Sequence, residues 1–370
     1  MVSSLFVDNY KTLVNFKIDF SNINMLIGIN GSGKTSIFEV LKKVREFVLE
    51  RRPADEIFPD SSLTRWQNVN IQTFEITMKE NEKEFIYHLE IEHMDEERQR
   101  VRSEYVQLNS KLLFRSENGS ARLYNDSFQE GPELLWDWSY SGVGSVYERR
   151  DNRLLTEFKQ LLSKIVVCRV KPIEDTAKAS EESMFPNYDF SNVTGVYMYI
   201  SQRYPDSVEK IRKSLKEINP DFMNVYISNF EKEKGLFFDY KCHETSFVLN
   251  FGELSDGERL TFQLYILIDC FMEKGFSVFI DEPDSFLSLK EIQPWCMNVE
   301  DSGDEKSRQC VIISHHPEII DFFAQSNGIW LSRLAYVATK IIEAPKTEYG
   351  DGKNMKYSEM IIRGDVDEPK

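Results

Sequence analysis

The sequence predicts an α/β protein with a mixed central sheet, an antiparallel β subdomain and a helical insertion. Near the N-terminus, the continuously apolar strand Met25–Ile27 enters a glycine-rich turn that opens a helix. In residues 257–331, short apolar strands alternate with amphipathic helices, which is typical of a parallel sheet. Residues 74–124 instead alternate apolar and polar positions, and this period of two indicates an antiparallel meander.

The first two thirds of the chain are expected to be rich in strands. Two alternating strands precede the buried one, the meander follows the first helix, and an amphipathic stretch leads to a further apolar strand. A polar connector, a helix and a hairpin form the insertion. Strands are expected at 5–7, 16–20, 25–27 and 165–170, the first helix from about 36 onward, the meander at 74–124 and the amphipathic stretch at 154–162. The connector is expected at 171–195, the second helix at 208–218 and the hairpin at 237–250.

The last third alternates helices with short strands that are almost wholly apolar. This order predicts that the strands lie parallel in the central sheet, with the helices as their connections. The helices are expected near 257–273, 288–299 and 317–325, and the strands at 277–280, 311–313 and 329–331.

Composition excludes several classes of protein. A chain of 370 residues with 41% hydrophobic and 13% aromatic residues is folded rather than disordered. Its net charge of −16 repels polyanions at long range, so a nucleic-acid site would need a local basic patch. The five cysteines show no CxxC spacing, which indicates neither a zinc site nor a disulfide framework. Neither a signal peptide nor a membrane span is apparent, and we expect a cytoplasmic protein with no membrane partner.

The glycine-rich turn Gly28–Thr35 satisfies the phosphate-loop pattern G-x-x-x-x-G-K-[ST]. It stands directly after a buried strand and opens a helix, which is the context that phosphate binding requires. Backbone N–H groups and the helix N-terminus would bind the phosphates of ATP. Lys34 would reach the β- and γ-oxygens, and the Thr35 hydroxyl would ligate Mg²⁺. The expected ATP-binding residues are Gly28, Asn30, Gly31, Ser32, Gly33, Lys34, Thr35 and Ser36.

Two adjacent carboxylates, Asp281 and Glu282, end an apolar strand. Ligands bind at the carboxyl ends of strands in open α/β sheets, so a second part of the nucleotide site is expected here. Asp281 would hold Mg²⁺ through water or together with Thr35, and Glu282 would polarise the attacking water. An acidic helix cap after a core strand is the alternative interpretation.

Residues 254–258, Leu-Ser-Asp-Gly-Glu, resemble the LSGGQ signature of ABC-type ATPases, with Asp256 and Glu258 in place of the first glycine and the glutamine. A serine and a glycine at a helix start form a second anion site. In the ABC family this site caps the γ-phosphate held by the other subunit. The resemblance therefore implies that Ser255 and Gly257 act in trans.

The same resemblance assigns further residues around the nucleotide. His315 follows a second apolar strand and matches the switch histidine, which contacts the γ-phosphate and the attacking water; a satisfied polar residue is the alternative. Asp284 lies in the stretch that resembles the D-loop at the dimer interface, and it could equally cap the next helix. For the Q-loop glutamine, Gln67 is our choice, with Gln107 as the other candidate.

The branch of the family is indicated by the 221 positions that separate Lys34 from Ser255. Transporter subunits have a much shorter segment there, and SMC-type proteins carry long heptad arms, which this sequence lacks. The chain resembles the compact RecF/OLD-like branch, the AAA-domain ATPases of prokaryotic defence and repair systems. Only 55 residues follow His315, and we expect no C-terminal Toprim nuclease.

This resemblance implies three regions and a shared site. An N-terminal ATPase lobe is expected at 1–170, a helical and hairpin insertion at 171–250, and a C-terminal ATPase lobe at 251–370. Two copies would bind two ATP molecules head to tail, in a homodimer or a larger homo-oligomer.

The expected role is the sensor or scaffold ATPase of an anti-phage or toxin–antitoxin-like system, with a separate nuclease or toxin as effector. Two alternatives stay open. A RecF-like repair ATPase would bind duplex DNA through the basic cluster Arg149, Arg150 and Arg153, and a nucleotide-binding platform would have negligible turnover.

Overall fold

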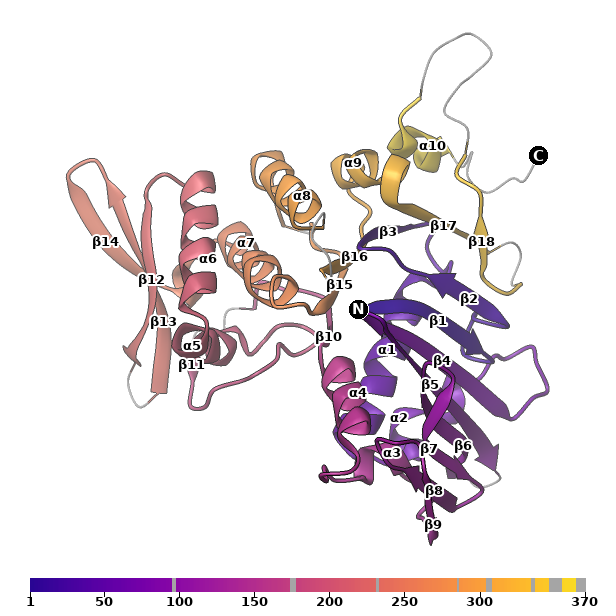
Figure 1. The fold of residues 1–370 in the computed structure, drawn as a ribbon. Helices are drawn as coiled ribbons and strands as arrows, with labels where there is room; N and C mark the ends of the chain where they lie inside the picture. The colour runs from indigo at the N-terminus through magenta and orange to yellow at the C-terminus, as the bar shows by residue number, and fades with distance from the viewer. Residues whose placement is uncertain are drawn as a thin grey trace.

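The chain folds into three sheets and the helices that pack between and around them, seen in a computed structural model (Figure 1). The α/β architecture, with a mostly parallel sheet beside an antiparallel subdomain and a helical insertion, confirms the predicted fold class. The structure describes residues 1–94, 98–173, 178–230, 233–284, 286–303, 308–333, 337–345 and 355–363.

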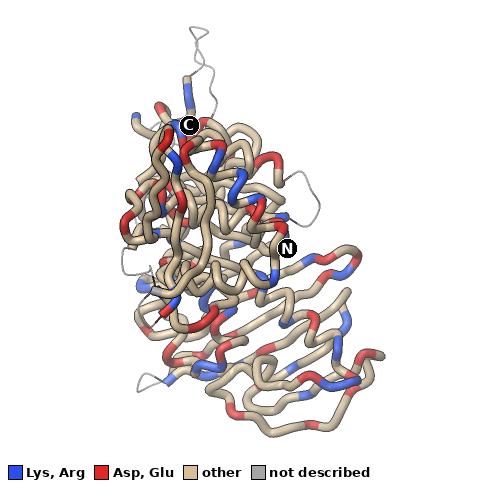
Figure 2. The backbone as a smooth tube through the Cα atoms, turned by 90° about the vertical axis from the view of Figure 1, so that its left-hand side faces the viewer, with Lys and Arg blue, Asp and Glu red and all other residues tan. Residues whose placement is uncertain are grey.

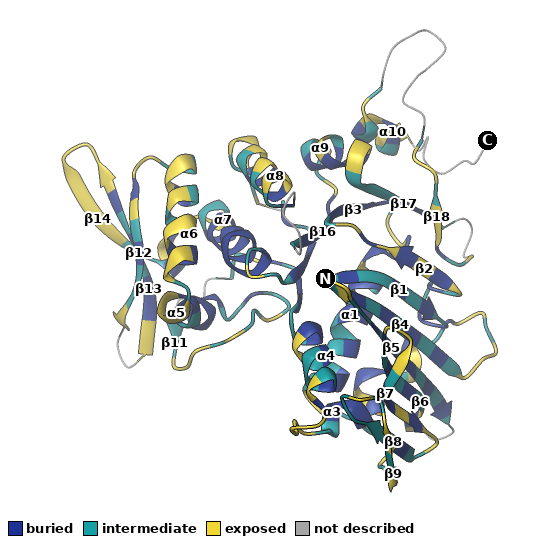
Figure 3. Cartoon of the chain, viewed as in Figure 1, coloured by how far each residue is buried: buried dark blue, intermediate teal, exposed yellow. Residues whose placement is uncertain are grey.

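The central sheet has six strands, of which five are parallel and the last, an edge strand, is antiparallel. Its strands β15, β16 and β3 are buried along their whole length, as the dark blue arrows near the centre of Figure 3 show. In spatial order the strands are β10 (Ile165–Cys168), β15 (Ser277–Asp281), β16 (Gln309–Ile313), β3 (Ile23–Ile27), β17 (Gly328–Ser332) and β18 (Lys340–Ile342).

The antiparallel sheet has eight strands and follows the predicted meander. Along β4 and β5 every second side chain is buried, because one face of the sheet covers the core and the other faces solvent. In spatial order the strands are β2 (Phe16–Asp19), β1 (Val2–Asp8), β4 (Ile71–Glu80), β5 (Lys83–Met94), β6 (Arg98–Leu108), β7 (Lys111–Glu117), β8 (Ser120–Tyr124) and β9 (Glu130–Leu135).

The helices divide between the two faces of the central sheet. Helix α1 lies between the two large sheets with the short helices of the first half, and the later helices cover the opposite face (Figure 1). The first group is α1 (Lys34–Leu49), α2 (Ala54–Ile57), α3 (Gly142–Ser145) and α4 (Arg153–Ser163). The second group is α7 (Asp256–Ile266) with its π-helical extension η4 (Leu267–Met272), α8 (Leu289–Gly303), α9 (Pro317–Asn327) and α10 (Tyr357–Arg363).

Successive side chains of each central strand point to opposite faces of the sheet, so the sheet separates two hydrophobic cores. Met25 packs with the later helices, whereas its neighbour Leu26 packs with α1 and the antiparallel sheet. Phe279 of β15 stacks edge-to-face with Phe20 and Phe38 at ring distances of 5.7 and 5.3 Å. These contacts fix α1, and the segment between β2 and β3, against the central sheet.

The insertion differs in part from its prediction. It contains a helix, α5 (Val193–Arg203), that the sequence pattern did not indicate, because this helix is buried on most sides and shows no amphipathic period. The expected hairpin is a three-stranded unit with a short fourth strand. The remaining elements are β11 (Lys178–Ala179), α6 (Pro205–Ile218), β12 (Phe222–Phe230), β13 (Glu233–Cys242) and β14 (Thr245–Asn250).

Asp269 is a buried acid in the extension of α7, where it accepts a hydrogen bond of 2.7 Å from the Ser214 hydroxyl. Burial raises the pKa of Asp269 from 3.8 to about 6. The folded state therefore binds more protons than the unfolded state between these values, and stability falls as the pH rises through this window.

We expect Asp269→Asn to stabilise the protein at pH 8. Each pKa unit corresponds to 1.36 kcal/mol, so the gain is at most about 3 kcal/mol. Thermal unfolding at pH 8 and pH 4 measures it: the variant should unfold a few degrees higher at pH 8, and the difference should shrink at pH 4. A gain of equal size at both values would contradict the titration of Asp269.

None of the described helices is both long and apolar enough to cross a membrane.

Candidate nucleotide-binding and hydrolysis site

The phosphate loop joins β3 to α1 in a conformation that requires glycine. Gly31 and Gly33 have φ angles of 81° and 96°, in the left-handed region that other residues seldom adopt. A Cβ on Gly28 would lie 2.3 Å from the carbonyl oxygen of Leu331 in β17. The loop therefore lies tightly against the neighbouring strand, and its backbone is free to approach an anion closely.

Lys34 is the buried cation of this loop. Its side chain is only 6% exposed, and Nζ donates to the carbonyl oxygens of Gly28 at 2.6 Å and Ile29 at 3.0 Å. Burial lowers the pKa of Lys34 to about 8, against the opposing effect of Asp281 and Glu282. The ammonium group is thus held inside the loop, where phosphate oxygens would replace backbone carbonyls as its partners.

Thr35 and Asp281 come together from separate elements. Thr35 is in the first turn of α1, Asp281 ends β15, and the Thr35 hydroxyl donates to Oδ2 of Asp281 at 3.4 Å. Asp281 is 1% exposed, and burial raises its pKa, with Arg169 opposing and Glu282 adding to the effect. A hydroxyl and a carboxylate beside a phosphate loop form an oxygen ligand set that suits Mg²⁺.

Glu282 lies immediately after the strand, where the backbone turns sharply. Its φ angle is 53°, and its N–H donates to the carbonyl oxygen of Ile313 at 2.8 Å. The Glu282 carboxylate forms an ion pair with the Arg169 guanidinium, which comes from the end of β10. Glu282 is therefore not a helix cap.

His315 and Asp284 lie at the same edge of the sheet. His315 is exposed just beyond β16, and desolvation and the charge of Lys34 lower its pKa, with Glu282 and Asp284 opposing. Burial raises the pKa of Asp284, and its hydrogen bond with Ser314 opposes that effect. These interactions place His315 near Lys34 and Glu282, and Asp284 near Glu282 and Ser314.

Ser255 is the N-cap of α7. Its hydroxyl accepts a hydrogen bond from the Glu258 N–H at 3.3 Å, and its own backbone N–H donates to the Glu258 carboxylate at 3.0 Å, which together form a capping box. The Ser255 hydroxyl also donates to that carboxylate at 2.8 Å. A Cβ on Gly257 would lie 3.3 Å from the carbonyl oxygen of Phe286. Among the described residues, no hydrogen bond or ion pair joins Ser255 to the phosphate loop of its own chain.

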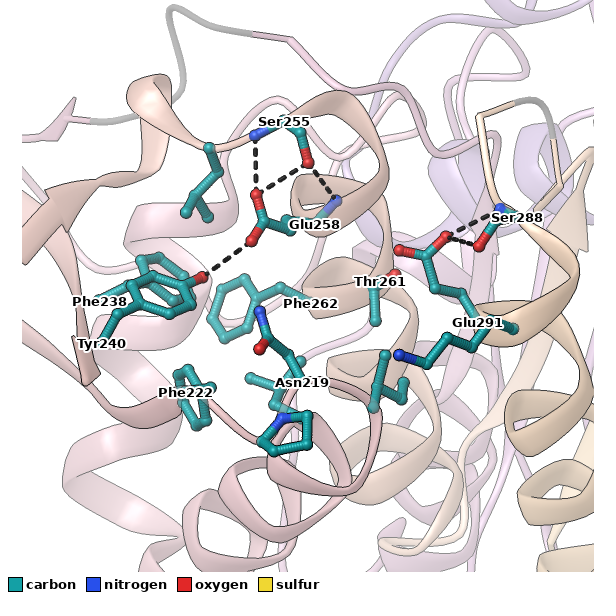
Figure 4. Close-up of a pocket in the computed structure, with 15 residues that line it drawn as sticks. Asn219, Phe222, Phe238, Tyr240, Ser255, Glu258, Thr261, Phe262, Ser288 and Glu291 are labelled. Atoms are coloured by element: carbon teal, nitrogen blue, oxygen red, sulfur yellow. Dashed lines mark hydrogen bonds between the residues drawn. The ribbon is translucent and has the colours of Figure 1, made fainter. Parts of the chain in front are cut away.

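A cavity of 460 Å³ lies beside α7, the helix that Ser255 caps (Figure 4). Its polar wall includes Ser255 and Glu258, and the Tyr240 hydroxyl donates to Glu258 at 3.3 Å. Its apolar wall comes from the insertion and includes Phe222 and Phe238. The insertion thereby contacts the segment that carries the signature residues.

In the described part of the chain, the contact between the segment around Gln67 and the phosphate loop is made by Trp66 and Arg333, and no hydrogen bond joins Gln67 itself to the loop. The Gln67 N–H donates to the carbonyl oxygen of Thr64 at 3.2 Å, and among the described residues its buried side-chain oxygen has no hydrogen-bond partner. The Arg333 guanidinium stacks 5.5 Å from the Trp66 ring, and its Nη1 donates to Gly31 at 3.3 Å. The assignment of Gln67 to the Q-loop therefore stays a prediction.

Sequence reasoning missed two arginines at this site, Arg169 and Arg333. Each follows an apolar strand, and a charged residue at a strand end was the available signal. The order of strands in the sheet, which places β10 beside β15, was not readable from the sequence.

A family model described as "AAA domain, putative AbiEii toxin, Type IV TA system" matches residues 23–321. The chain belongs to this family. The match covers the phosphate loop, the carboxylate pair and His315, so the chain is a P-loop ATPase of the AAA type.

Solved structures with a similar fold are SMC head domains. One is the SMC head domain from Pyrococcus furiosus with an extended coiled coil, bound to the C-terminal domain of ScpA; its TM-score is 0.52, with 12% identity over 99% of each chain. Another is the SMC head domain from Thermotoga maritima, with a TM-score of 0.47 and 13% identity, covering 93% of this chain and 99% of that one. No curated protein matches the chain.

Proposed function

We propose that the chain hydrolyses ATP in a head-to-tail dimer and serves as the sensor or scaffold ATPase of a defence or toxin–antitoxin-like system. The hydrolytic part is supported by one observation above all: Lys34, Asp281 and Glu282 converge at the carboxyl edge of one sheet. A platform that only binds nucleotide has no need of Glu282 beside this site.

Different residues of the chain bind the phosphates, hold the metal ion and activate the attacking water. The loop N–H groups and Lys34 bind the phosphates, and Thr35 with Asp281 would hold Mg²⁺, which neutralises charge on the β- and γ-phosphates when bound. Glu282 orients the attacking water and takes its proton. His315, whose lowered pKa keeps it neutral near pH 7, is available to hydrogen-bond the γ-phosphate.

The dimeric part of the proposal rests on the position of Ser255. Ser255 is the N-cap of α7, a helix N-terminus favours an anion, and among the described residues Ser255 has no hydrogen bond or ion pair to the phosphate loop of the same chain. A second copy, related to the first by a twofold axis, would bring Ser255 of one chain to the phosphate loop of the other. Such an isologous arrangement closes as a dimer.

The defence role rests on the family description, which names a toxin–antitoxin system. The effector would be a separate nuclease or toxin. Basic and acidic residues are interspersed along the chain (Figure 2), and the net charge of −16 disfavours long-range attraction of DNA.

Direct binding of duplex DNA is the second candidate, and one observation favours it. Arg149, Arg150 and Arg153 are all exposed, just before and at the start of α4. Salt-dependent duplex binding that is lost in the triple alanine variant would support this candidate.

The test of the proposal is Glu282→Gln. The amide keeps the size of the side chain but cannot accept a proton, so we expect ATP binding to persist and turnover to be lost. A nucleotide-bound dimer or larger assembly should then accumulate. Release of phosphate and the molecular mass by light scattering, each with and without ATP, measure both effects.

The same measurements on the wild type separate the candidates. Normal turnover in Glu282→Gln would show that Glu282 does not carry the reaction. A mass that ATP does not change in either protein would contradict the proposed dimer, and stimulation of turnover by duplex DNA would favour the repair alternative.

A further inference from the structure

Arg169 is a charged residue at the carboxyl edge of the central sheet that no motif accounts for. We propose that Arg169 is a positioning residue of the hydrolytic site, whose guanidinium fixes the Glu282 carboxylate where the attacking water is bound. This inference rests on the proposed function, because it concerns the side chain that is assigned to the water.

Strand register brings the two residues to one edge. Strands β10 and β15 are parallel, and Cys168 pairs with Ile280, so Arg169 follows directly beside Asp281. The Arg169 N–H donates to the carbonyl oxygen of Tyr188 at 2.6 Å, which fixes its backbone. The guanidinium then reaches across Asp281 to the Glu282 carboxylate.

The backbone of Glu282 explains why its side chain needs a partner. A φ angle of 53° is strained in a residue with a Cβ, and it ends the alternation of side chains that β15 follows. The hydrogen bond to Ile313 holds this turn, but a backbone hydrogen bond does not set the side-chain torsions of Glu282. The ion pair with Arg169 restricts them.

The exposure of the pair argues for a role in the reaction rather than in folding. The side chains of Arg169 and Glu282 are 40% and 32% exposed, and ion pairs this accessible contribute little to stability. A misplacement of about 1 Å at a reacting group, by contrast, can reduce a rate about 100-fold. Positioning is the larger effect that this contact can have.

Arg169→Gln and Arg169→Lys test the proposal. We expect the glutamine variant to lose about 10- to 100-fold in kcat, with a change in the dissociation constant for ATP of less than about threefold. Lysine keeps the charge but not the planar fork of donors, so it should restore part of kcat. Arg203→Gln is the matched control, since Arg203 pairs with Glu182 at 46% and 31% exposure away from the site.

A second readout needs no nucleotide. The Glu282 N–H is hydrogen-bonded to Ile313, so its hydrogen exchange reports how firmly this turn is held. We expect faster exchange at this amide in nucleotide-free Arg169→Gln than in the wild type or in Arg203→Gln. Mass spectrometry of peptides that cover residues 279–284 measures it.

The outcomes separate this inference from the proposed function. If Arg169→Gln matches Arg203→Gln in both kcat and amide exchange, Arg169 does not position Glu282. If Arg169→Gln lowers the unfolding temperature and leaves kcat unchanged, and Arg169→Lys has no higher kcat than Arg169→Gln, the role of Arg169 is structural. Normal turnover in Glu282→Gln would instead overturn the proposed function, and the exchange experiment would still decide whether Arg169 holds Glu282.

Discussion

Lys34→Met is expected to weaken ATP binding by about 100-fold or more. Hydrogen bonds to charged groups contribute about 1.5–3 kcal/mol, and each 1.4 kcal/mol changes affinity tenfold. Lys34 points into its own loop and is almost fully buried, so no exposed cation can take its place there. Isothermal titration with ATP measures the loss. Stability should not fall, because methionine removes a buried charge while keeping the apolar stem.

Lys159→Met is the matched control for this substitution. Lys159 also donates to two backbone carbonyls, those of Gly144 and Val146, and burial also lowers its pKa to about 8. It lies in α4, and in the part of the chain that the structure describes no hydrogen bond or ion pair joins it to the phosphate loop. We expect its replacement to leave ATP affinity unchanged, and equal losses in the two variants would show that the effect on binding is general.

The parts of the site that the sequence predicted are those in which residue type and local order determine the chemistry. Gly33 must be glycine at a φ angle of 96°, and the pattern that demands it is continuous in the chain. Asp281 and Thr35 lie 246 positions apart and still meet at 3.4 Å, because both follow strands whose carboxyl ends share one edge of the sheet.

The parts that the sequence did not predict depend on which strands are neighbours. Arg169 is 113 positions from Glu282, and only the pairing of β10 with β15 joins them. Helix α5 was missed for a different reason, since a helix buried on most sides carries no periodic signal. The contact that we propose between Ser255 and a nucleotide in the other copy is a third case, because a contact made in trans is not present within one chain.

Mixing two inactive variants is expected to restore turnover if Ser255 acts in trans. In Lys34→Met both sites of the dimer lack the lysine, and in Ser255→Arg both sites carry a bulky cation in place of the signature hydroxyl. A mixed dimer contains one site with both residues intact and one site with both changed. Equal amounts that exchange freely should therefore regain about a quarter of wild-type turnover, because half of the dimers are mixed and half of their sites are intact.

The control for this experiment is the mixture of each variant with a second preparation of itself, which should stay inactive. Ser255→Arg also removes an N-cap worth about 1 kcal/mol, so its thermal unfolding must show a folded protein before mixing. If the mixture stays inactive although light scattering shows ATP-dependent dimers, Ser255 and Lys34 do not share a site. Recovery to about a quarter would show that each site is built from two chains, since neither chain alone supplies both residues.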